Sequence, residues 1–281
     1  MKTKELYNSI TLDLMDVMDE SDARSSARLL LEEITGLTQS QLVTRDALGL
    51  TDRQKEKLDE FIHRILDHEP IQYVIKKAHF YGRDYFVSPE VLIPRRETEE
   101  LVYHIINDRP KANAHILDIG TGSGCIPITL KLELVKVSVE ALDISQMALN
   151  VAKTNAKDLG ASITFHEIDI LNSQPLLGSY DIIVSNPPYV TYSEIPEMKD
   201  NVLDHEPHLA LFVKNTKPLE FYDAIINKAK HSLNKGGKLY FEINEKFGKE
   251  VSDLLFDANF HGVQVIKDMQ GKDRIVKASV K

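Results

Sequence analysis

The first part of the chain carries its apolar residues at helical spacing. One apolar stripe is made of Ala23, Ala27, Leu30, Leu31 and Ile34. Positions three and four apart share one helix face, and Gly36 just beyond the stripe is a common type of helix stop. Thr51 and Gln54 form a capping-box pattern ahead of a second stripe. We expect residues 1–70 to form a small helical domain, with Ser21 capping the first of these two helices.

A different pattern begins near residue 71, where apolar runs shorten to strand length. Residues 78–81 and 84–87 flank Gly82 and Arg83. Two short runs around a glycine predict a β-hairpin. We place this hairpin in a linker over residues 71–89.

Beyond residue 90, strand-like runs alternate with helical patterns. The predicted strands lie near residues 115–119, 137–142, 162–168, 180–185, 238–243, 261–267 and 274–280. A helix is expected near 97–107 before the first strand, and further helices lie between the strands. This alternation is typical of an α/β fold with a mostly parallel sheet.

A glycine-rich turn follows the strand predicted over residues 115–119. Its residues, with the acid that precedes them, are Asp118, Gly120, Thr121, Gly122, Ser123 and Gly124. Glycines at a strand-to-helix turn let the backbone approach a ligand where a Cβ would collide. Cys125 stands where the dinucleotide fingerprint requires glycine, and no P-loop lysine follows, so tight phosphate binding is not indicated. Asp118 instead suits a ligand with a positive charge.

A second acid, Asp143, ends the next predicted strand. It lies 25 residues after Asp118, close to the spacing at which a second-strand carboxylate binds a ribose diol. The structural alternative is a helix cap, because Asp143 or Ser145 could open the helix expected over residues 146–159. The two roles are compatible.

The most informative stretch is a tetrapeptide directly after the run 180–185. It consists of Asn186, Pro187, Pro188 and Tyr189. Two prolines leave a stiff backbone that offers carbonyl acceptors but few donors. Asn186 adds a side-chain acceptor and Tyr189 a flat aromatic face, so the set can hold both protons of an –NH₂ group and stack on its plane. Taken alone, the tetrapeptide is better interpreted as an ordinary loop sequence with a structural role. Beside the glycine loop and Asp143, it predicts a site for planar amino groups.

These three features together resemble the S-adenosylmethionine-dependent amino-methyltransferases. The resemblance narrows with residues 69–73, 91–95, 97–99 and 183–186, with Glu206-Pro207, and with Gly271 and Asp273-Arg274. In these segments the chain is similar to the HemK/PrmC family. Those bacterial enzymes methylate the side-chain amide of a glutamine in peptide chain release factors. The resemblance covers essentially the whole chain from Glu69 onward, and the helical start is also of that type.

The resemblance implies a Rossmann-like methyltransferase domain over residues 90–281, with a mostly parallel seven-stranded sheet. The N-terminal helical domain would recognise the protein partner. The cofactor would be S-adenosyl-L-methionine and the product S-adenosyl-L-homocysteine. The implied cofactor-binding residues are Asp118, Gly120, Thr121, Gly122, Ser123, Gly124, Asp143, Asp169, Ile170 and Asn186, with Asp169 and Ile170 flanking the adenine. The implied substrate-binding residues are Asn186, Pro187, Pro188 and Tyr189, of which Asn186, Pro187 and Tyr189 are catalytic.

Three positions depart from the family pattern. Lys76 and Asn244 stand where glycine is usual, and Arg96 replaces a usual proline. All three lie in loops or strand ends around the expected site, outside the cofactor loop and the tetrapeptide. His205 and Glu206 are close in sequence to the expected site, but we interpret them as loop or surface residues without a proton-transfer role.

Composition narrows the class of protein further. The chain has 281 residues, a formal net charge of -9, one cysteine and no apolar stretch of membrane-spanning length. One cysteine excludes a disulfide framework and a cysteine metal site, and the acidic balance argues against a broad basic surface for nucleic acid. We expect a cytoplasmic, monomeric enzyme whose partners are release factors, with no metal, no membrane association and no direct nucleic-acid binding.

Two alternatives remain open at this stage. The tetrapeptide would serve equally well, by shape, to methylate an exocyclic amino group of adenine or guanine in a nucleic acid. The protein could instead be a catalytically silent cofactor-binding adaptor. A silent protein would have no need of both an intact glycine loop and an intact tetrapeptide.

Overall fold

A computed structural model describes residues 2–172, 175–176, 178–198 and 200–281. The predicted domains also run through residues 1, 173–174, 177 and 199, which lie outside the described part of the chain. The chain divides into two compact units. One comprises Met1–Lys77 with Lys199–His205, and the other comprises Ala78–Met198 with Glu206–Lys281.

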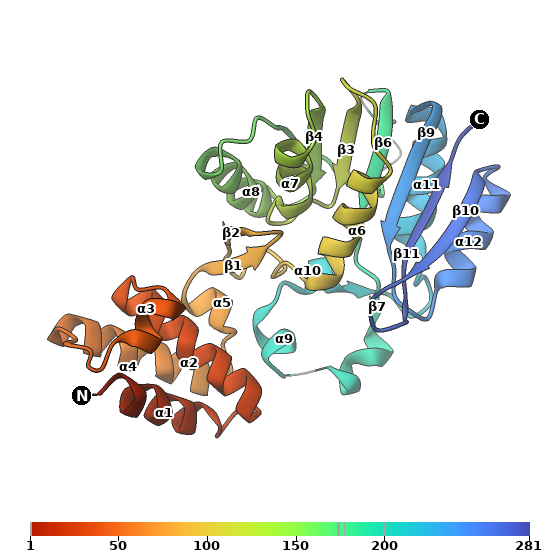
Figure 1. The fold of residues 1–281 in the computed structure, drawn as a ribbon. Helices are drawn as coiled ribbons and strands as arrows, with labels where there is room; N and C mark the ends of the chain where they lie inside the picture. The colour runs from red at the N-terminus through yellow and green to blue at the C-terminus, as the bar shows by residue number, and fades with distance from the viewer. Residues whose placement is uncertain (1, 173–174, 177, 199) are drawn as a thin grey trace. The chain divides into compact units, whose positions relative to one another are not determined.

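The first unit is helical. Its helices are α1 (Thr3–Leu14), α2 (Glu20–Thr35), α3 (Gln39–Thr44), α4 (Asp52–Leu66), α5 (Ile71–Val74) and α9 (Asp200–His205). Helices α1, α2 and α4 pack against one another (Figure 1). The predicted stripe of α2 is buried in their core, beside Ile10, Leu58 and Phe61 from α1 and α4.

The helix ends show which capping predictions hold. Gly36 ends α2 in the left-handed conformation, and Thr51 and Gln54 form the expected capping box of α4. Ser21 as the cap of α2 is wrong, because the helix begins at Glu20. Asp19 is the cap, and its Oδ1 accepts a hydrogen bond from the backbone N–H of Asp22 at 2.9 Å.

Lys76 adopts a backbone conformation that favours glycine. It follows the end of α5 with φ of 56°, and its side chain is exposed. A side chain in the left-handed region costs roughly 1–2 kcal/mol, whereas glycine occupies it freely but loses more chain entropy on folding. We expect Lys76→Gly to raise the free energy of unfolding by about 0.5–1 kcal/mol in urea titrations. Lys153→Gly, inside an exposed helix face, is the control and should lower it by about 1 kcal/mol. Equal losses in both variants would contradict the prediction.

The second unit is built around a large sheet. Its first strands form a hairpin, β1 (Lys77–Phe80), which begins at the last residue of the first unit, and β2 (Arg83–Phe86). Its helices are α6 (Arg96–Asn107), α7 (Cys125–Glu133), α8 (Gln146–Asp158), α10 (His208–Leu211), α11 (Glu220–Ser232) and α12 (Gly248–Asp257), with the 3-10 helix η1 (Tyr192–Glu197). The remaining strands are β3 (His115–Ile119), β4 (Ser138–Asp143), β5 (Thr164–Glu167), β6 (Tyr180–Ser185), β7 (Val190–Thr191), β8 (Phe212–Val213), β9 (Leu233–Glu242), β10 (His261–Lys267) and β11 (Asp273–Ser279).

Within the described residues, seven strands form the large sheet in the order β10-β11-β9-β6-β3-β4-β5. The five strands from β9 to β5 run parallel, while β11 is antiparallel to both β9 and β10. The predicted α/β fold with a mostly parallel seven-stranded sheet is confirmed. In this described part of the chain, no helix combines the length and apolar character needed to cross a membrane.

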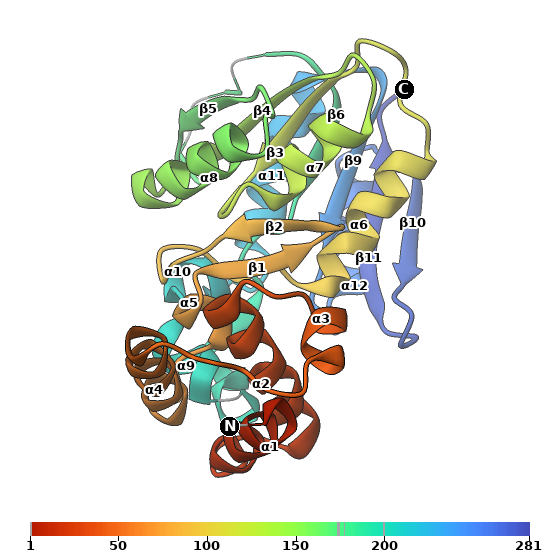
Figure 2. The ribbon, with the colours of Figure 1, turned by 60° about the vertical axis from the view of Figure 1, so that its left-hand side comes forward.

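Helices cover both faces of this sheet. Neighbouring residues on one strand, such as Ile116 and Leu117 of β3, belong to two different cores. The first core is closed by α6, α7, α8 and the β1–β2 hairpin, and the second by α11 and α12. Figure 2 shows α11 and α12 on the opposite side of the sheet from α6 and α7. This double cover explains why the parallel strands read as nearly continuous apolar runs.

The topology fixes where a ligand is expected. From β3 the chain proceeds through β4 to β5 on one side, and then returns to β6 on the other side of β3. In open α/β sheets, ligands bind at the carboxyl ends of the strands where the strand order reverses in this way. The glycine loop follows β3 and the 186–189 tetrapeptide follows β6, so both lie at that point.

Candidate active site

The glycine loop between β3 and α7 is held by its neighbour β4. The backbone N–H groups of Gly120 and Thr121 both donate to the carbonyl of Leu142, at 2.9 and 3.0 Å. Gly124 caps α7 with φ of 80°, and a Cβ there would lie only 3.0 Å from Ile128 and 3.1 Å from Ala152 Cβ. This glycine is therefore required by close helix packing as well as by its backbone conformation.

The other two loop glycines face open space. Gly120 and Gly122 have φ of 75° and 52°, and a Cβ on either would meet no heavy atom of the described residues within 4 Å. Behind the loop, Cys125 opens α7 and is buried; burial raises the pKa of its thiol to about 12. The loop is therefore firmly backed on one side and offers accessible backbone on the other.

Asp143 ties the loop to the next helix. Its Oδ2 accepts from the N–H of Gly122 and its Oδ1 from the N–H of Ser145, both at 2.9 Å. Ser145 is the cap of α8, because its Oγ accepts from the N–H of Ala148 at 3.2 Å. Burial raises the pKa of Asp143, and these backbone donors oppose the shift. Each carboxylate oxygen has further acceptor capacity, so a tethering role leaves room for a diol.

The side chains of Asp118 and Thr121 differ from the other polar groups of the loop, because they are buried without a hydrogen-bond partner among the described residues. Asp118 is fully buried, and among the described residues neither of its side-chain oxygens has a hydrogen-bond partner. The same is true of Thr121 Oγ1, whereas the backbone carbonyl of Ser123 accepts from Asn155. Buried polar groups without partners are rare and point to an absent ligand.

This arrangement fits S-adenosylmethionine, the cofactor that the resemblance implies. Its methionine part carries an ammonium group that a buried carboxylate would pair, and its ribose carries the diol that suits Asp143. The open face beside Gly120 and Gly122 lets the backbone approach such a ligand closely.

Because Asp118 is buried without a partner, we expect it to lower the stability of the folded protein in a way that depends on pH. Burial raises the pKa of the Asp118 carboxyl from 3.8 to about 7; the nearby Thr121 hydroxyl opposes this shift, and Asp143 adds to it. The folded protein therefore retains a proton that the unfolded chain releases between about pH 4 and 7, so Asp118 makes stability fall as pH rises through this window. Glu242, whose pKa burial also raises to about 7, acts in the same direction.

We therefore expect Asp118→Asn to raise the melting temperature of the ligand-free protein at pH 8 and to change it little at pH 5. The variant should also bind S-adenosylmethionine more weakly at pH 8, because it cannot supply the negative charge. Thermal unfolding at both pH values and calorimetric titration provide the two measurements. The same stability difference at pH 5 and pH 8 would contradict the assignment of the raised pKa.

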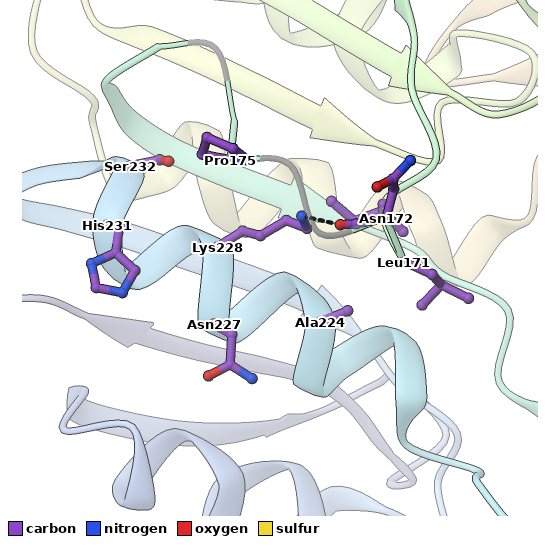
Figure 3. Close-up of a pocket in the computed structure, with 9 residues that line it drawn as sticks. Leu171, Asn172, Pro175, Ala224, Asn227, Lys228, His231 and Ser232 are labelled. Carbon is purple, nitrogen blue, oxygen red and sulfur yellow. Dashed lines mark hydrogen bonds between the residues drawn. The ribbon is translucent and has the colours of Figure 1, made fainter.

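Asp169 and Ile170 are the second and third residues after the end of β5. Asp169 is exposed and its Oδ1 accepts from the N–H of Leu171, whereas the Ile170 side chain is buried in the core beneath α11. Ile170 also lines a hollow beside α11, where Lys228 donates to the carbonyl of Asn172 (Figure 3). The Ile170 side chain thus faces the α11 core. Their place beside an adenine stays a prediction.

The tetrapeptide is joined to β3 through the residue before it. Ser185 pairs with Ile119, and its Oγ donates to the Ile119 carbonyl at 2.7 Å. Asn186 and Pro188 are half-buried and Pro187 is buried. Asn186 therefore emerges from the sheet directly beside the start of the glycine loop.

A buried polar chain holds the two ends of the tetrapeptide. Asn186 Nδ2 donates to Thr98 Oγ1 at 3.3 Å, and Thr98 Oγ1 donates to Glu242 Oε2 at 2.7 Å. The hydroxyl of Tyr189 donates to Glu242 Oε1 at 3.3 Å. This bond leaves the half-buried Tyr189 ring fixed at its outer end, and burial raises the pKa of the hydroxyl.

Several structural residues escaped the sequence analysis. Glu206 lies in the loop between α9 and α10, as one of the two interpretations had it, but its side chain is buried. It accepts from Arg95 at 2.5 Å and from the Ile93 N–H at 3.3 Å. Asn155 of α8 joins the loop carbonyl of Ser123 to both backbone groups of Phe86. The sequence offered one sign that Glu242 is important, because this carboxylate ends an apolar run. The residues that bond to Glu242 lie far from it in sequence and could not be predicted.

The remaining departures from the family pattern have local explanations. Arg96 is the first residue of α6, a position at which proline is also favourable. Asn244 is buried, and its Nδ2 donates to both carboxylate oxygens of Glu194, at 3.3 and 3.2 Å. Asn244 therefore connects the end of β9 to η1, which a glycine could not do.

Comparison with known proteins agrees with this geometry. Residues 97–206 match the Methyltransferase small domain, and residues 5–75 match the PrmC N-terminal domain. The chain is 42% identical over 271 residues to a release factor glutamine methyltransferase of Bacteroides thetaiotaomicron, which covers 96% of this chain and 97% of the relative. It is also 42% identical over 283 residues to that of Flavobacterium psychrophilum, covering 99% of each.

Among solved structures, a methyltransferase from Pyrococcus furiosus has a TM-score of 0.53 at 19% identity, covering 77% of this chain and 96% of that chain. This likeness confirms the Rossmann-like methyltransferase fold. The sequence relatives go further, since they extend over nearly the full length of both chains. The chain belongs to the family of release factor glutamine methyltransferases.

Proposed function

We propose that the protein transfers a methyl group from S-adenosylmethionine to the side-chain amide nitrogen of a glutamine, the one in the Gly-Gly-Gln motif of peptide chain release factors. The observation that carries this proposal is the orientation of Asn186. Its Nδ2 is engaged by Thr98, which leaves Oδ1 to accept from a substrate N–H beside the glycine loop. The names of the relatives support the choice of glutamine and of release factors as the substrate.

The chemical problem is that an amide nitrogen is a poor nucleophile, because its lone pair is delocalised into the carbonyl. The bound cofactor supplies an electrophilic methyl group on a sulfonium. Asn186 Oδ1 and the Pro187 carbonyl accept the two amide protons, and Tyr189 packs on the amide plane. The nitrogen lone pair is thereby aimed in one direction, and such orientation contributes up to roughly 7–11 kcal/mol in favourable intramolecular reactions.

The same acceptors act on the charge that develops during transfer. The amide N–H groups become more acidic as the nitrogen is alkylated, so bonds to Asn186 Oδ1 and the Pro187 carbonyl strengthen. As the N–CH₃ bond forms, the S–CH₃ bond breaks and S-adenosylhomocysteine leaves, while the proton lost by the nitrogen passes to solvent water, so no side-chain base is needed. On the cofactor side, we assign Asp118 to the ammonium group, the glycine loop to the methionine part and Asp143 to the ribose hydroxyls.

We assign partner recognition to the first unit. Its helices α2 and α4 bury one face and expose a polar one, and it carries no glycine loop of the cofactor-binding type. The full-length protein should therefore methylate an intact release factor far better than a short Gly-Gly-Gln peptide. Equal efficiency on the peptide and the intact factor would remove the first unit from substrate recognition.

The test of the function is incubation with labelled S-adenosylmethionine and either purified release factor, duplex DNA or ribosomal RNA, followed by mass spectrometry. We expect label on the release factor only, at the glutamine of the Gly-Gly-Gln motif. Label on a nucleobase would establish the exocyclic-amine alternative instead. Cofactor binding without label in any of the three would establish the silent adaptor.

A further inference from the structure

The polar chain behind the tetrapeptide joins three separate parts of the second unit. Thr98 comes from the first turn of α6, Glu242 from the last residue of β9, and Asn186 from the loop after β6. The side chains of Thr98 and Glu242 are almost completely buried, with exposed fractions of 3% and 1%. Burying a carboxylate is costly, so its presence directly behind Asn186 calls for an explanation beyond packing.

The direction of each hydrogen bond in this polar chain follows from the chemistry of Glu242, the carboxylate at which it ends. An ionised carboxylate can only accept hydrogen bonds, so Thr98 and Tyr189 must both donate to Glu242. A threonine hydroxyl has one proton, and Thr98 has used it. Only lone pairs of Thr98 remain for Asn186, which must therefore present Nδ2 rather than Oδ1 to Thr98. The charge of Glu242 thus decides which way the Asn186 carboxamide faces.

We propose that Thr98 and Glu242 are positioning residues that lock the Asn186 carboxamide with its Oδ1 toward the substrate amide. This inference rests on the proposed function, because it assigns a purpose to the orientation of Asn186. Neither residue touches the reacting atoms. With the carboxamide reversed, Nδ2 would meet the substrate –NH₂ group donor to donor, and the amide would not be held.

The charged and titratable groups around Glu242 indicate how the lock responds to pH. The Thr98 hydroxyl, Arg274 of β11 and Tyr189 lower the pKa of Glu242, and Glu97 of α6 raises it. Tyr222 of α11 donates to the Glu242 backbone carbonyl at 3.2 Å. Burial outweighs these effects and raises the pKa to about 7. Protonated Glu242 can donate to Thr98 and release its hydroxyl to Asn186 Oδ1. The rate of methyl transfer at saturating cofactor should therefore fall as pH drops through about 7.

The test compares Thr98→Val, Thr98→Ser and Glu242→Gln in steady-state methylation of intact release factor. Valine keeps the shape of threonine but removes the hydroxyl, so kcat should fall about 10- to 100-fold, the scale expected when a reacting group is misaligned. The KM for release factor and the Kd for S-adenosylmethionine should be unchanged. Serine restores the hydroxyl and should return kcat to within a few-fold of the parent. Glu242→Gln should lower kcat and abolish its acidic limb near pH 7.

A matched control and a readout without turnover complete the experiment. Thr129 of α7 is also buried, and its hydroxyl forms a 2.9 Å hydrogen bond with the hydroxyl of Tyr85, which is not part of the tetrapeptide. Thr129→Val should leave kcat unchanged. In protein with ¹⁵N-labelled asparagine, the Nδ2 protons of Asn186 should exchange slowly with solvent in the parent and faster in Thr98→Val.

Three results would overturn the inference: parent kcat in Thr98→Val, equal loss in the valine and serine variants, or an unchanged pH profile in Glu242→Gln. Failure of the proposed function is distinguishable from these. It would show as a parent protein that does not methylate release factor, or as full activity in Asn186→Ala. If Asn186→Ala is inactive and Thr98→Val is fully active, only the positioning role is lost.

Discussion

Replacing Asn186 by alanine should lower turnover on release factor by on the order of 10²- to 10³-fold, the loss seen when one oriented hydrogen bond of a catalytic site is removed. The physical reason is that Oδ1 matters chiefly when the amide nitrogen is aligned for attack. The Kd for S-adenosylmethionine should change far less than kcat. Steady-state kinetics and calorimetric titration of the same preparation measure both quantities.

Two further variants sharpen this expectation. Asn186→Asp keeps an acceptor, so a role limited to hydrogen bonding predicts partial activity. Because a carboxylate cannot donate to Thr98, this variant also tests the bond that holds Asn186. Asn227→Ala is the control, since Asn227 is exposed on α11, where its Nδ2 donates to Asp223 Oδ1 at 3.0 Å. If Asn186→Ala turned over at the parent rate, Asn186 would be a turn residue and the amide-clamp mechanism would be abandoned.

The second large effect is expected at Asp143. Asp143→Ala should weaken S-adenosylmethionine binding by about 10- to 100-fold, the equivalent of the 1.5–3 kcal/mol typical of a hydrogen bond to a charged group. The variant loses acceptors for the ribose hydroxyls and also the tether from Gly122 to Ser145. Calorimetric titration gives the affinity directly.

An analogue separates these two contributions. A cofactor analogue lacking a ribose hydroxyl should bind the parent protein more weakly than S-adenosylmethionine does. Asp143→Ala should bind the two ligands equally, because the partner of that hydroxyl has been removed. If the variant still discriminated between them as the parent does, Asp143 would serve only as the loop tether.

Local sequence signals predicted the elements that depend on local chemistry. The strands His115–Ile119, Tyr180–Ser185 and His261–Lys267 begin and end where the apolar runs do. The left-handed residue Gly36 ends α2, and Thr51 caps α4, because each of these features is decided within a few residues. Ser21 failed because an aspartate two positions earlier offers a better acceptor to the same helix start.

What could not be predicted depends on contacts between distant segments. The parallel pair β7–β8 joins two-residue strands that carry no periodicity of their own. Thr98 and Glu242 are 144 residues apart, and the sequence around each of them gives no sign that the two side chains form a hydrogen bond. The sequence alone therefore suggested the residues of the candidate site, whereas the buried groups that contact them could be found only from the fold.

The buried Cys125 gives this protein a natural reporter of motion. Its thiol stands at the first residue of α7, directly behind the glycine loop, and it is the single cysteine of the chain. Alkylating reagents attack only the thiolate, and burial suppresses both access to the sulfur and its ionisation. We therefore expect modification to require conformations in which the sulfur becomes exposed. The alkylation half-life of the unmodified protein should report how often this exposure occurs without any engineered label, and a ligand that stabilises the buried state should lengthen it.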